Sequence, residues 1–101
     1  MNTEQKTCLI TGGNSGIGKQ AAIQLAQIGF HVIIGVRNIK RGELALSEIK
    51  KKSKKNDIEL LQIDMSSKSS IQEGSLELKN RINKLDVLIH NAADFDISRT
   101  H

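Results

Sequence analysis

Four glycines fall within seven positions of the segment TCLITGGNSGIGKQAA, residues 7–22. They separate an apolar run from an alanine-rich one, so they lie between two regular elements. Because glycine loses the most backbone entropy on folding, such a cluster indicates a tight turn or a close approach of the backbone to a ligand. A phosphate group is the leading candidate, since free N–H groups at the start of a following helix would face the anion. A tight turn without a ligand is the alternative.

Three of these glycines, Gly12, Gly16 and Gly18, have the spacing G-x-x-x-G-x-G rather than G-x-G-x-x-G. We expect them to perform the same three functions. One makes the turn out of a strand, one lets the backbone reach a pyrophosphate, and one lets helix and strand pack closely. Gly13 is interpreted as a loop residue without a specific role.

The elements that must position this loop alternate between strand and helix patterns. Apolar runs predict strands at residues 6–11, 30–36, 57–63 and 85–90. Three helices are expected between them. The first covers residues 17–28, with Ile17, Ala21, Leu25 and Ile28 at helical spacing, and ends at Gly29. The second is capped by Asn38 and carries Leu44, Ala45 and Ile49, and the third begins at the serine-rich segment 66–70 and carries Ile71, Leu78 and Ile82. This β-α-β-α-β-α-β order requires right-handed crossovers and so predicts a parallel sheet in the order 3-2-1-4 with helices on both faces. It is the first half of a Rossmann-type α/β fold, in which ligands bind at the carboxyl ends of the strands.

Composition limits the chain to one small domain, residues 1–101, with 38% hydrophobic and 26% charged residues. No signal peptide or membrane-spanning run is apparent, so we expect a cytoplasmic location without a membrane partner. Cys8 is the one cysteine, which excludes a disulfide framework, and it is interpreted as a small buried hydrophobic residue.

The net charge of +4 is local in origin, because eight basic side chains fall within residues 37–55. The run KKKSKK at residues 50–55 could be a nucleic-acid or nuclear-import patch. The favoured alternative is the solvated end of a helix, where lysines complement the helix dipole. Only Phe30 and Phe95 are aromatic, so stacking on bases has little support and no nucleic-acid partner is predicted.

TGGNSGIG resembles the T-G-x-x-x-G-x-G motif of the short-chain dehydrogenase/reductase family. Three further pieces follow in the order of that family, namely GVRN at 35–38, IDMSS at 63–67 and HNAA at 90–93. The similarity covers nearly all of residues 6–95. Within the family, TGGNSGIGK and RNIKRGELAL are most similar to NADP-dependent, retinol-dehydrogenase-like members.

The end of the second strand bears on the choice of cofactor. An acidic residue there would bind the adenosine ribose and repel a 2′-phosphate, but GVRN contains none. Arg37 can instead pair with phosphate oxygens, and Asn38 is a further donor, so NADP(H) is the predicted cofactor. A solvent-exposed arginine at the start of a helix is the alternative.

The resemblance also implies contacts at the other strand ends. It places Asp64 and Met65 beside the adenine, and Asn91 and Ala92 beside the ribose; a helix-cap or turn role is the alternative for Asp64. His90 and Ala93 stand where the family has asparagine and glycine, and His90 is interpreted as a structural residue, with no metal site indicated by the histidine spacing. The predicted cofactor-binding residues are Gly12, Asn14, Ser15, Gly16, Ile17, Gly18, Arg37, Asn38, Asp64, Met65, Asn91 and Ala92.

The activity implied by the resemblance is hydride transfer between NADP(H) and an alcohol or carbonyl substrate. It uses a tyrosine as acid and base, with a lysine and a serine. This sequence has no tyrosine, so we assign no catalytic residue and expect the 101-residue chain alone to be inactive. We interpret it as the cofactor-binding part of an oxidoreductase, truncated after the fourth strand and prone to self-association through that edge. A free-standing, non-catalytic dinucleotide-binding module and a basic nucleic-acid-binding domain are the alternatives.

Overall fold

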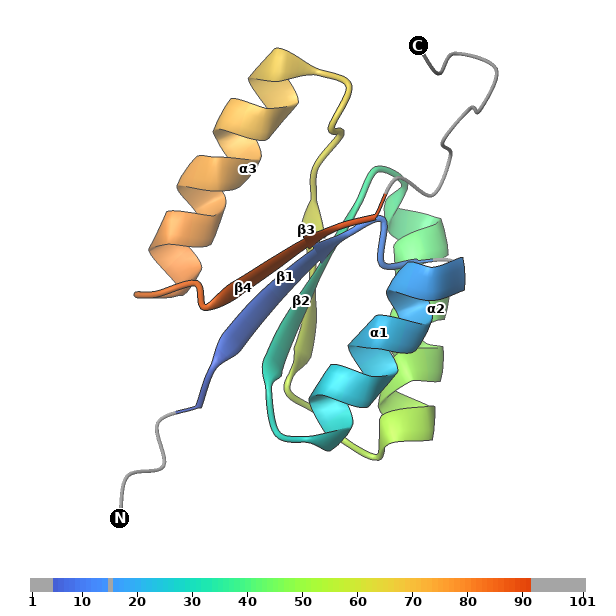
Figure 1. The fold of residues 1–101 in the computed structure, drawn as a ribbon. Coiled ribbons are helices and arrows are strands. Elements are labelled where there is room, and N and C mark those ends of the chain that lie inside the picture. The colour runs from blue at the N-terminus through green and yellow to red at the C-terminus, as the bar shows by residue number, and fades with distance from the viewer. Residues whose placement is uncertain (1–4, 15, 92–101) are drawn as a thin grey trace, which may run out of the picture.

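The computed structural model describes residues 5–14 and 16–91. Strands and helices alternate through this part of the chain as β1 (Thr7–Thr11), α1 (Gly16–Gln27), β2 (His31–Val36), α2 (Ile39–Ser53), β3 (Ile58–Gln62), α3 (Lys68–Arg81) and β4 (Val87–His90). All strand pairs are parallel and the sheet order is β3-β2-β1-β4. Helices α1 and α2 cover one face of the sheet and α3 lies over the other (Figure 1). The predicted Rossmann-type fold and strand order are confirmed.

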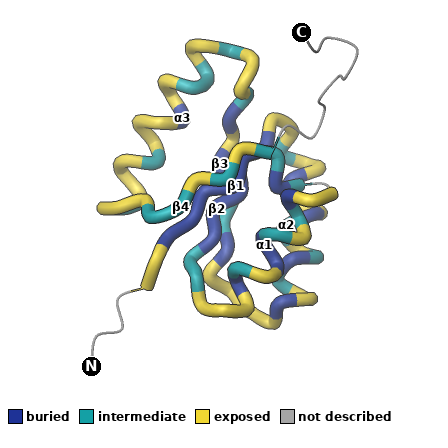
Figure 2. The backbone as a smooth tube through the Cα atoms, in the orientation of Figure 1, coloured by how far each residue is buried: buried dark blue, intermediate teal, exposed yellow. Residues whose placement is uncertain are grey.

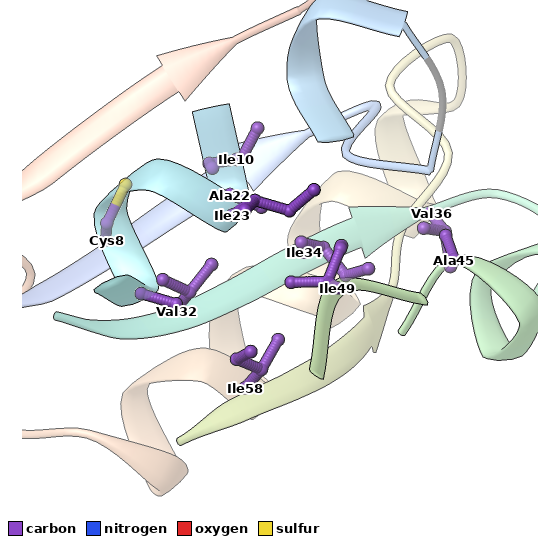
Figure 3. Close-up of a cluster of buried hydrophobic side chains, with 11 residues drawn as sticks. Cys8, Ile10, Ala22, Ile23, Val32, Ile34, Val36, Ala45, Ile49 and Ile58 are labelled. Carbon is purple, nitrogen blue, oxygen red and sulfur yellow. The ribbon is translucent and has the colours of Figure 1, made fainter. Parts of the chain in front are cut away.

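The main core lies between the sheet and the pair α1 and α2, as the close-up of its side chains shows (Figure 3). Its buried residues are Cys8, Ile10, Ala22, Ile23, Ala26, Val32, Ile34, Val36, Ala45, Ile49 and Ile58. Cys8 is fully buried, as predicted, and burial raises the pKa of its thiol to about 11. The thiol is therefore protonated at neutral pH and serves as packing.

The buried face of α1 agrees only in part with the predicted one, since Ala21 and Leu25 pack, partly buried, against the core. Ile17 and Ile28, which were expected to pack, are 81% and 71% exposed. The residues of α1 that are buried are Gly18, Ala22, Ile23 and Ala26. Small side chains bring the helix backbone close to the sheet, so the contact face centres on them and the larger isoleucines at its margin face outward.

In α2 too, a large apolar residue that was expected to pack faces outward: Leu44 is 75% exposed. Ala45 and Ile49, which were predicted on the same helix, are buried, and Gly42 is buried beside them. A Cβ on Gly42 would lie 2.7 Å from Val36 Cγ2, so this helix too approaches the sheet through its smallest residues. The start of α2 is as predicted, since Asn38 Oδ1 accepts a hydrogen bond of 3.0 Å from the Arg41 N–H.

The lysine run occupies the last turn of α2 and the loop that follows. Lys50, Lys51 and Lys52 lie in the last turn, where positive charge complements the helix dipole. Lys54 ends the helix in the left-handed conformation, at φ 61°. This is the placement expected of a solvated helix end. None of the helices in the described ranges is long and apolar enough to cross a membrane.

The opposite face of the sheet carries a smaller core under α3. Leu9, Ile33 and Leu61 are buried there, and Leu78 and Ile82 pack partly against them. Figure 2 shows the contrast between the buried central strands and α3, in which only Gly74 is buried. Helix α3 is therefore the most lightly packed of the three described helices.

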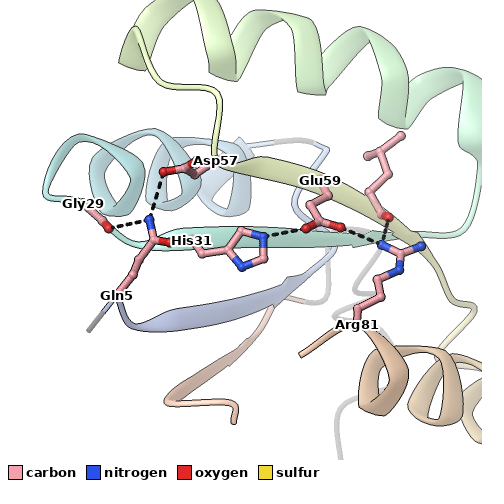
Figure 4. Close-up of polar contacts among 7 residues, drawn as sticks. Gln5, Gly29, His31, Asp57, Glu59 and Arg81 are labelled. Carbon is pink, nitrogen blue, oxygen red and sulfur yellow. Dashed lines mark hydrogen bonds and ion pairs between the residues drawn. The ribbon is translucent and has the colours of Figure 1, made fainter. Parts of the chain in front are cut away.

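A series of polar contacts links the end of α3 to the edge of the sheet (Figure 4). His31 Nε2 lies 2.6 Å from Glu59 Oε2, and Glu59 Oε1 accepts a hydrogen bond of 3.1 Å from Arg81 Nη1. The same Arg81 nitrogen donates to the Leu60 carbonyl at 2.6 Å. Arg81, the last residue of α3, thus links the helix to β3 and through Glu59 to β2.

Asp86 joins the start of β1 to the start of β4, and we expect it to make folding stability depend on pH. Its Oδ2 accepts a hydrogen bond of 2.8 Å from the Thr7 N–H, and its own N–H donates to the Thr7 carbonyl at 2.9 Å. The bond from Thr7, with the nearby charges of Lys84 and Lys6, lowers the pKa of this carboxyl. A lowered folded-state pKa stabilises the fold above the unfolded value of about 4, and this contribution is lost as pH falls through the folded pKa.

Asp86→Asn should therefore melt at a lower temperature than the parent near pH 7, and the two melting temperatures should converge as pH falls through the lowered pKa of Asp86. Thermal melts followed by circular dichroism at a series of acidic pH values measure the difference. Glu43→Gln, the same change of charge at an exposed position of α2, is the control. A difference that stays constant down to the lowest pH would mean that ionisation of Asp86 is irrelevant.

Candidate functional site

The predicted cofactor-binding residues that the structure describes lie at the carboxyl ends of the four strands. Residues 12–14 form the turn between β1 and α1, and Arg37 directly follows β2. Asp64 follows β3, and Asn91 follows β4. Because β4 lies beside β1 while the chain between them runs outward through β2 and β3, the sheet order reverses at this point. Such a reversal is where open α/β sheets form their ligand crevice.

Two of the three motif glycines are required by contacts within the protein. Gly12 has a φ of +69°, and a Cβ there would lie 2.2 Å from the Asn91 carbonyl oxygen. A Cβ on Gly18 would lie 2.6 Å from the Gly12 carbonyl oxygen and 2.7 Å from Asn91 Nδ2. Gly12 therefore lets the turn pass under the end of β4, and Gly18 lets α1 pack against the turn.

Gly16 differs from these two, because its surroundings are open. It has a φ of +53°, and apart from its chain neighbours and the backbone of its own helix no described atom lies within 4 Å of where its Cβ would be. It is also the first residue of α1, whose first N–H groups have no partner within the helix. Of the motif glycines, this is the one whose open side could admit an anion.

Gly13 was interpreted as a loop residue without a role, and this is wrong. It is buried, and a Cβ there would lie 2.7 Å from Ile34 Cγ2 and 3.3 Å from the Ile10 carbonyl oxygen. The turn thus packs directly onto β2. The motif spacing gives no sign of this contact, because it depends on how closely β2 lies under the turn.

Asn91 fixes the turn from the side of β4. Its Nδ2 donates a hydrogen bond of 3.0 Å to the Gly12 carbonyl, and its N–H donates to the Thr11 carbonyl at 3.1 Å. Gly12 N–H in turn donates to the Gly35 carbonyl of β2 at 2.8 Å. The turn is therefore held from both neighbouring strands, which preorganises it before any ligand arrives.

His90 lies opposite Thr11 in the register of β4 with β1. Its Nδ1 is 2.7 Å from Thr11 Oγ1, so the ring and the hydroxyl share a hydrogen bond. This contact is of the structural kind predicted for a residue at a strand end.

Asp64 is held in a tight turn that leads into α3. Its Oδ1 accepts hydrogen bonds from the Ser66 N–H at 2.9 Å and from Ser66 Oγ at 2.7 Å. These bonds, and to a lesser degree the positive charge of Arg37, lower the pKa of the carboxyl. The turn role raised as an alternative is therefore present. It leaves Oδ2 without a hydrogen bond from the described residues.

Arg37 and Asp64 share the wall of a cavity of about 400 Å³. The other lining residues are Gln62, Ser70, Glu73, Gly74 and Glu77. Four of the seven lining residues come from α3, and none of these four was predicted. The carboxyl ends of the strands are recognisable from the sequence pattern, but the approach of α3 to this edge is not.

The remaining predicted residues are spread around the turns. Asn14 is half-buried in the turn, and Ile17 projects from the first turn of α1 with 81% exposure. Met65 is 43% exposed beside Asp64. Ser15 and Ala92 lie outside the described residues.

Comparison with known proteins defines the family. The sequence model for short chain dehydrogenases matches residues 6–100. Dehydrogenase/reductase SDR family member 13 of Homo sapiens is 34% identical over 99 residues, which is 98% of this chain and 26% of that protein. Human retinol dehydrogenase 13 is 33% identical over 87 residues, 86% of this chain and 26% of that protein. The chain belongs to the short-chain dehydrogenase family.

The solved structures agree in fold. The Pseudomonas aeruginosa RhlG/NADP active-site complex superposes with a TM-score of 0.77 at 28% identity, over 86% of this chain and 34% of that one. The chain thus spans about a quarter of the length of the two curated relatives and a third of this structure. The family model covers the glycine-rich turn, and the relatives include a retinol dehydrogenase, in agreement with the predicted resemblance to the family and to its retinol-dehydrogenase-like members.

Proposed function

We propose that this chain binds NADP(H), as the cofactor-binding part of an oxidoreductase that transfers hydride between the nicotinamide and an alcohol or carbonyl group. The observation that carries the proposal is the residue after β2. Arg37 stands there, on the wall of the 400 Å³ cavity, in a position where NAD-specific Rossmann proteins use a carboxylate. A guanidinium attracts a 2′-phosphate, whereas a carboxylate repels it.

The turn between β1 and α1 suits the pyrophosphate. Gly16 leaves the start of α1 open, and the N–H groups of the first helical turn supply donors for an anion. Asp64 has Oδ2 available to accept from the adenine amino group, and Met65 offers an apolar surface beside it. When bound, the dinucleotide supplies the hydride.

The alternatives have less support. A nucleic-acid-binding role for the lysine run is disfavoured because those lysines lie at the end of α2, where the helix dipole accounts for them. A non-catalytic module and the cofactor-binding part of an enzyme would bind the dinucleotide in the same way. They differ in whether a catalytic part acts together with this chain. The sequence has no tyrosine to protonate a carbonyl oxygen, so we expect no carbonyl reduction by these 101 residues alone.

Arg37→Ala tests the choice of cofactor. We expect it to weaken NADPH binding by about 1.5 to 3 kcal/mol, or about tenfold to a hundredfold, because charge-assisted hydrogen bonds to the 2′-phosphate are lost. NADH binding should change little. Titrations that follow the fluorescence of the reduced nicotinamide, at fixed ionic strength, give both dissociation constants.

Lys51→Ala is the matched control, since it removes the same charge from the far end of α2. It is preferred to Lys52→Ala because Lys52 pairs with Glu48 at 3.0 Å. Its effect on NADPH should be small and should disappear at higher salt. Equal weakening of NADH and NADPH by Arg37→Ala would make the arginine a general electrostatic residue and remove the main support for NADP(H).

A further inference from the structure

Helix α3 contacts the adenosine side of the site at two points, although none of its residues belongs to the glycine motif. The first is a hydrogen bond of 2.8 Å from the Asp64 N–H to Ser70 Oγ. Ser70 lies in the first turn of α3, and its own N–H donates to Ser67 Oγ, the N-cap, at 3.2 Å. The capped end of the helix thus holds the backbone of Asp64 directly.

The second point lies one turn further along α3. Gly74 is buried, and a Cβ there would lie 2.8 Å from Ile63 Cδ1 and 3.0 Å from Ile63 Cγ1. On its other side Ile63 meets β2, since a Cβ on Gly35 would lie 2.9 Å from Ile63 Cγ2. The side chain of Ile63, the residue before Asp64, is therefore held between two glycines, one from β2 and one from α3.

These contacts connect the two sides of the cavity. The Ile63 N–H donates to the Val36 carbonyl at 2.9 Å, so Ile63 is tied to the residue before Arg37. Gln62 Nε2 approaches the Arg37 carbonyl at 3.4 Å. The distance between Arg37 and Asp64 thus depends on how the Ile63 side chain packs, and α3 provides one of the two surfaces against which it packs.

We propose that Ser70 is a positioning residue for the adenosine end of the cofactor, and that α3, through Ser70 and the close approach at Gly74, holds the Asp64–Met65 turn at the right place opposite Arg37. This rests on the proposed function, because it assigns the adenosine to this turn. Ser70 acts on the Asp64 backbone and needs no contact of its own with the ligand. Its removal should weaken NADPH and NADH by the same factor, since both carry adenosine, whereas loss of Arg37 discriminates between them.

Ser70→Ala tests the proposal, with Ser69→Ala as the matched control in the same turn of α3. We expect Ser70→Ala to weaken both dinucleotides about threefold to tenfold, because one hydrogen bond that fixes the turn is lost. The competing fragment 5′-AMP should lose the same factor. Ser70→Thr, which keeps the hydroxyl, should restore binding, and Ser69→Ala should match the parent. Binding is followed by nicotinamide fluorescence below the melting temperature of every variant.

A second variant does not depend on the hydroxyl. Gly74→Ala is expected to push α3 away from Ile63 and to weaken both dinucleotides in the same proportion, although alanine favours the helix itself. Equal affinities for Ser70→Ala and Ser69→Ala, or unchanged binding in Gly74→Ala, would overturn the positioning role and leave NADP(H) binding intact. A failure of Arg37→Ala to separate NADPH from NADH would contradict the cofactor choice alone. A parent chain that binds neither dinucleotide would overturn both proposals.

Discussion

Gly12→Ala is expected to destabilise the fold by about 2 to 5 kcal/mol. A non-glycine residue in the left-handed conformation costs about 1 to 2 kcal/mol, and overpacking by the new Cβ costs about 1 to 3 kcal/mol more. The new Cβ would lie 2.2 Å from the Asn91 carbonyl oxygen, a backbone atom that no rotamer change can move. Relief requires the end of β4 to shift away from β1, at the cost of the hydrogen bonds that Asn91 makes to Thr11 and Gly12. Urea unfolding followed by circular dichroism, at one protein concentration, measures the loss.

Gly16→Ala is the control for this prediction. It lies in the same turn and has a similar φ of +53°, but its Cβ would meet no described atom within 4 Å beyond its chain neighbours and the backbone of α1. Only the conformational strain of about 1 to 2 kcal/mol should remain. If Gly12→Ala were no less stable than Gly16→Ala, the carboxyl end of β4 would have to be free to move, and the close packing of the turn against Asn91 would not matter for folding.

The order of elements was predictable because its signals are local. Asn38 and Ser67 are N-cap residues, and Gly29, at φ +103°, follows the end of α1. Alternation of strand and helix then leaves few topologies, since crossovers are right-handed. The faces of the helices were harder to predict. The spacing of apolar residues predicts that Ile17 and Leu44 are buried, but the face that contacts the sheet is determined by the small residues that allow close approach.

For the site too, the residues at the strand ends could be predicted from the sequence, whereas the contacts made by α3 could not. Residues that follow the strands, such as Arg37 and Asp64, could be located from the ends of the apolar runs, and the structure brings both to one cavity. Ser70 and Gly74 could not be predicted, because their role depends on the position of α3 relative to Ile63. A glycine inside a helical pattern lowers helix propensity, but nothing in the sequence indicates which residue of the sheet it contacts.

Gly16→Val is expected to abolish most dinucleotide binding while the fold remains. A branched side chain would occupy the open side of the turn and keep the pyrophosphate from the N–H groups at the start of α1. Loss of two charge-assisted hydrogen bonds of about 1.5 to 3 kcal/mol each corresponds to more than a hundredfold in affinity. NADPH and NADH should be affected equally, because the pyrophosphate is common to both. The measurement is a pair of fluorescence titrations beside a far-ultraviolet circular dichroism spectrum.

Gly29→Val separates this effect from backbone strain. Gly29 also has a positive φ, of +103°, and open space around its Cβ, but it lies after the opposite end of α1, away from the carboxyl ends of the strands. Both valine variants should lose stability through strain, whereas only Gly16→Val should lose binding. If the two variants bound the dinucleotides equally well, or if helicity fell in proportion to affinity in Gly16→Val, Gly16 would be a folding residue. The pyrophosphate would then have to bind elsewhere.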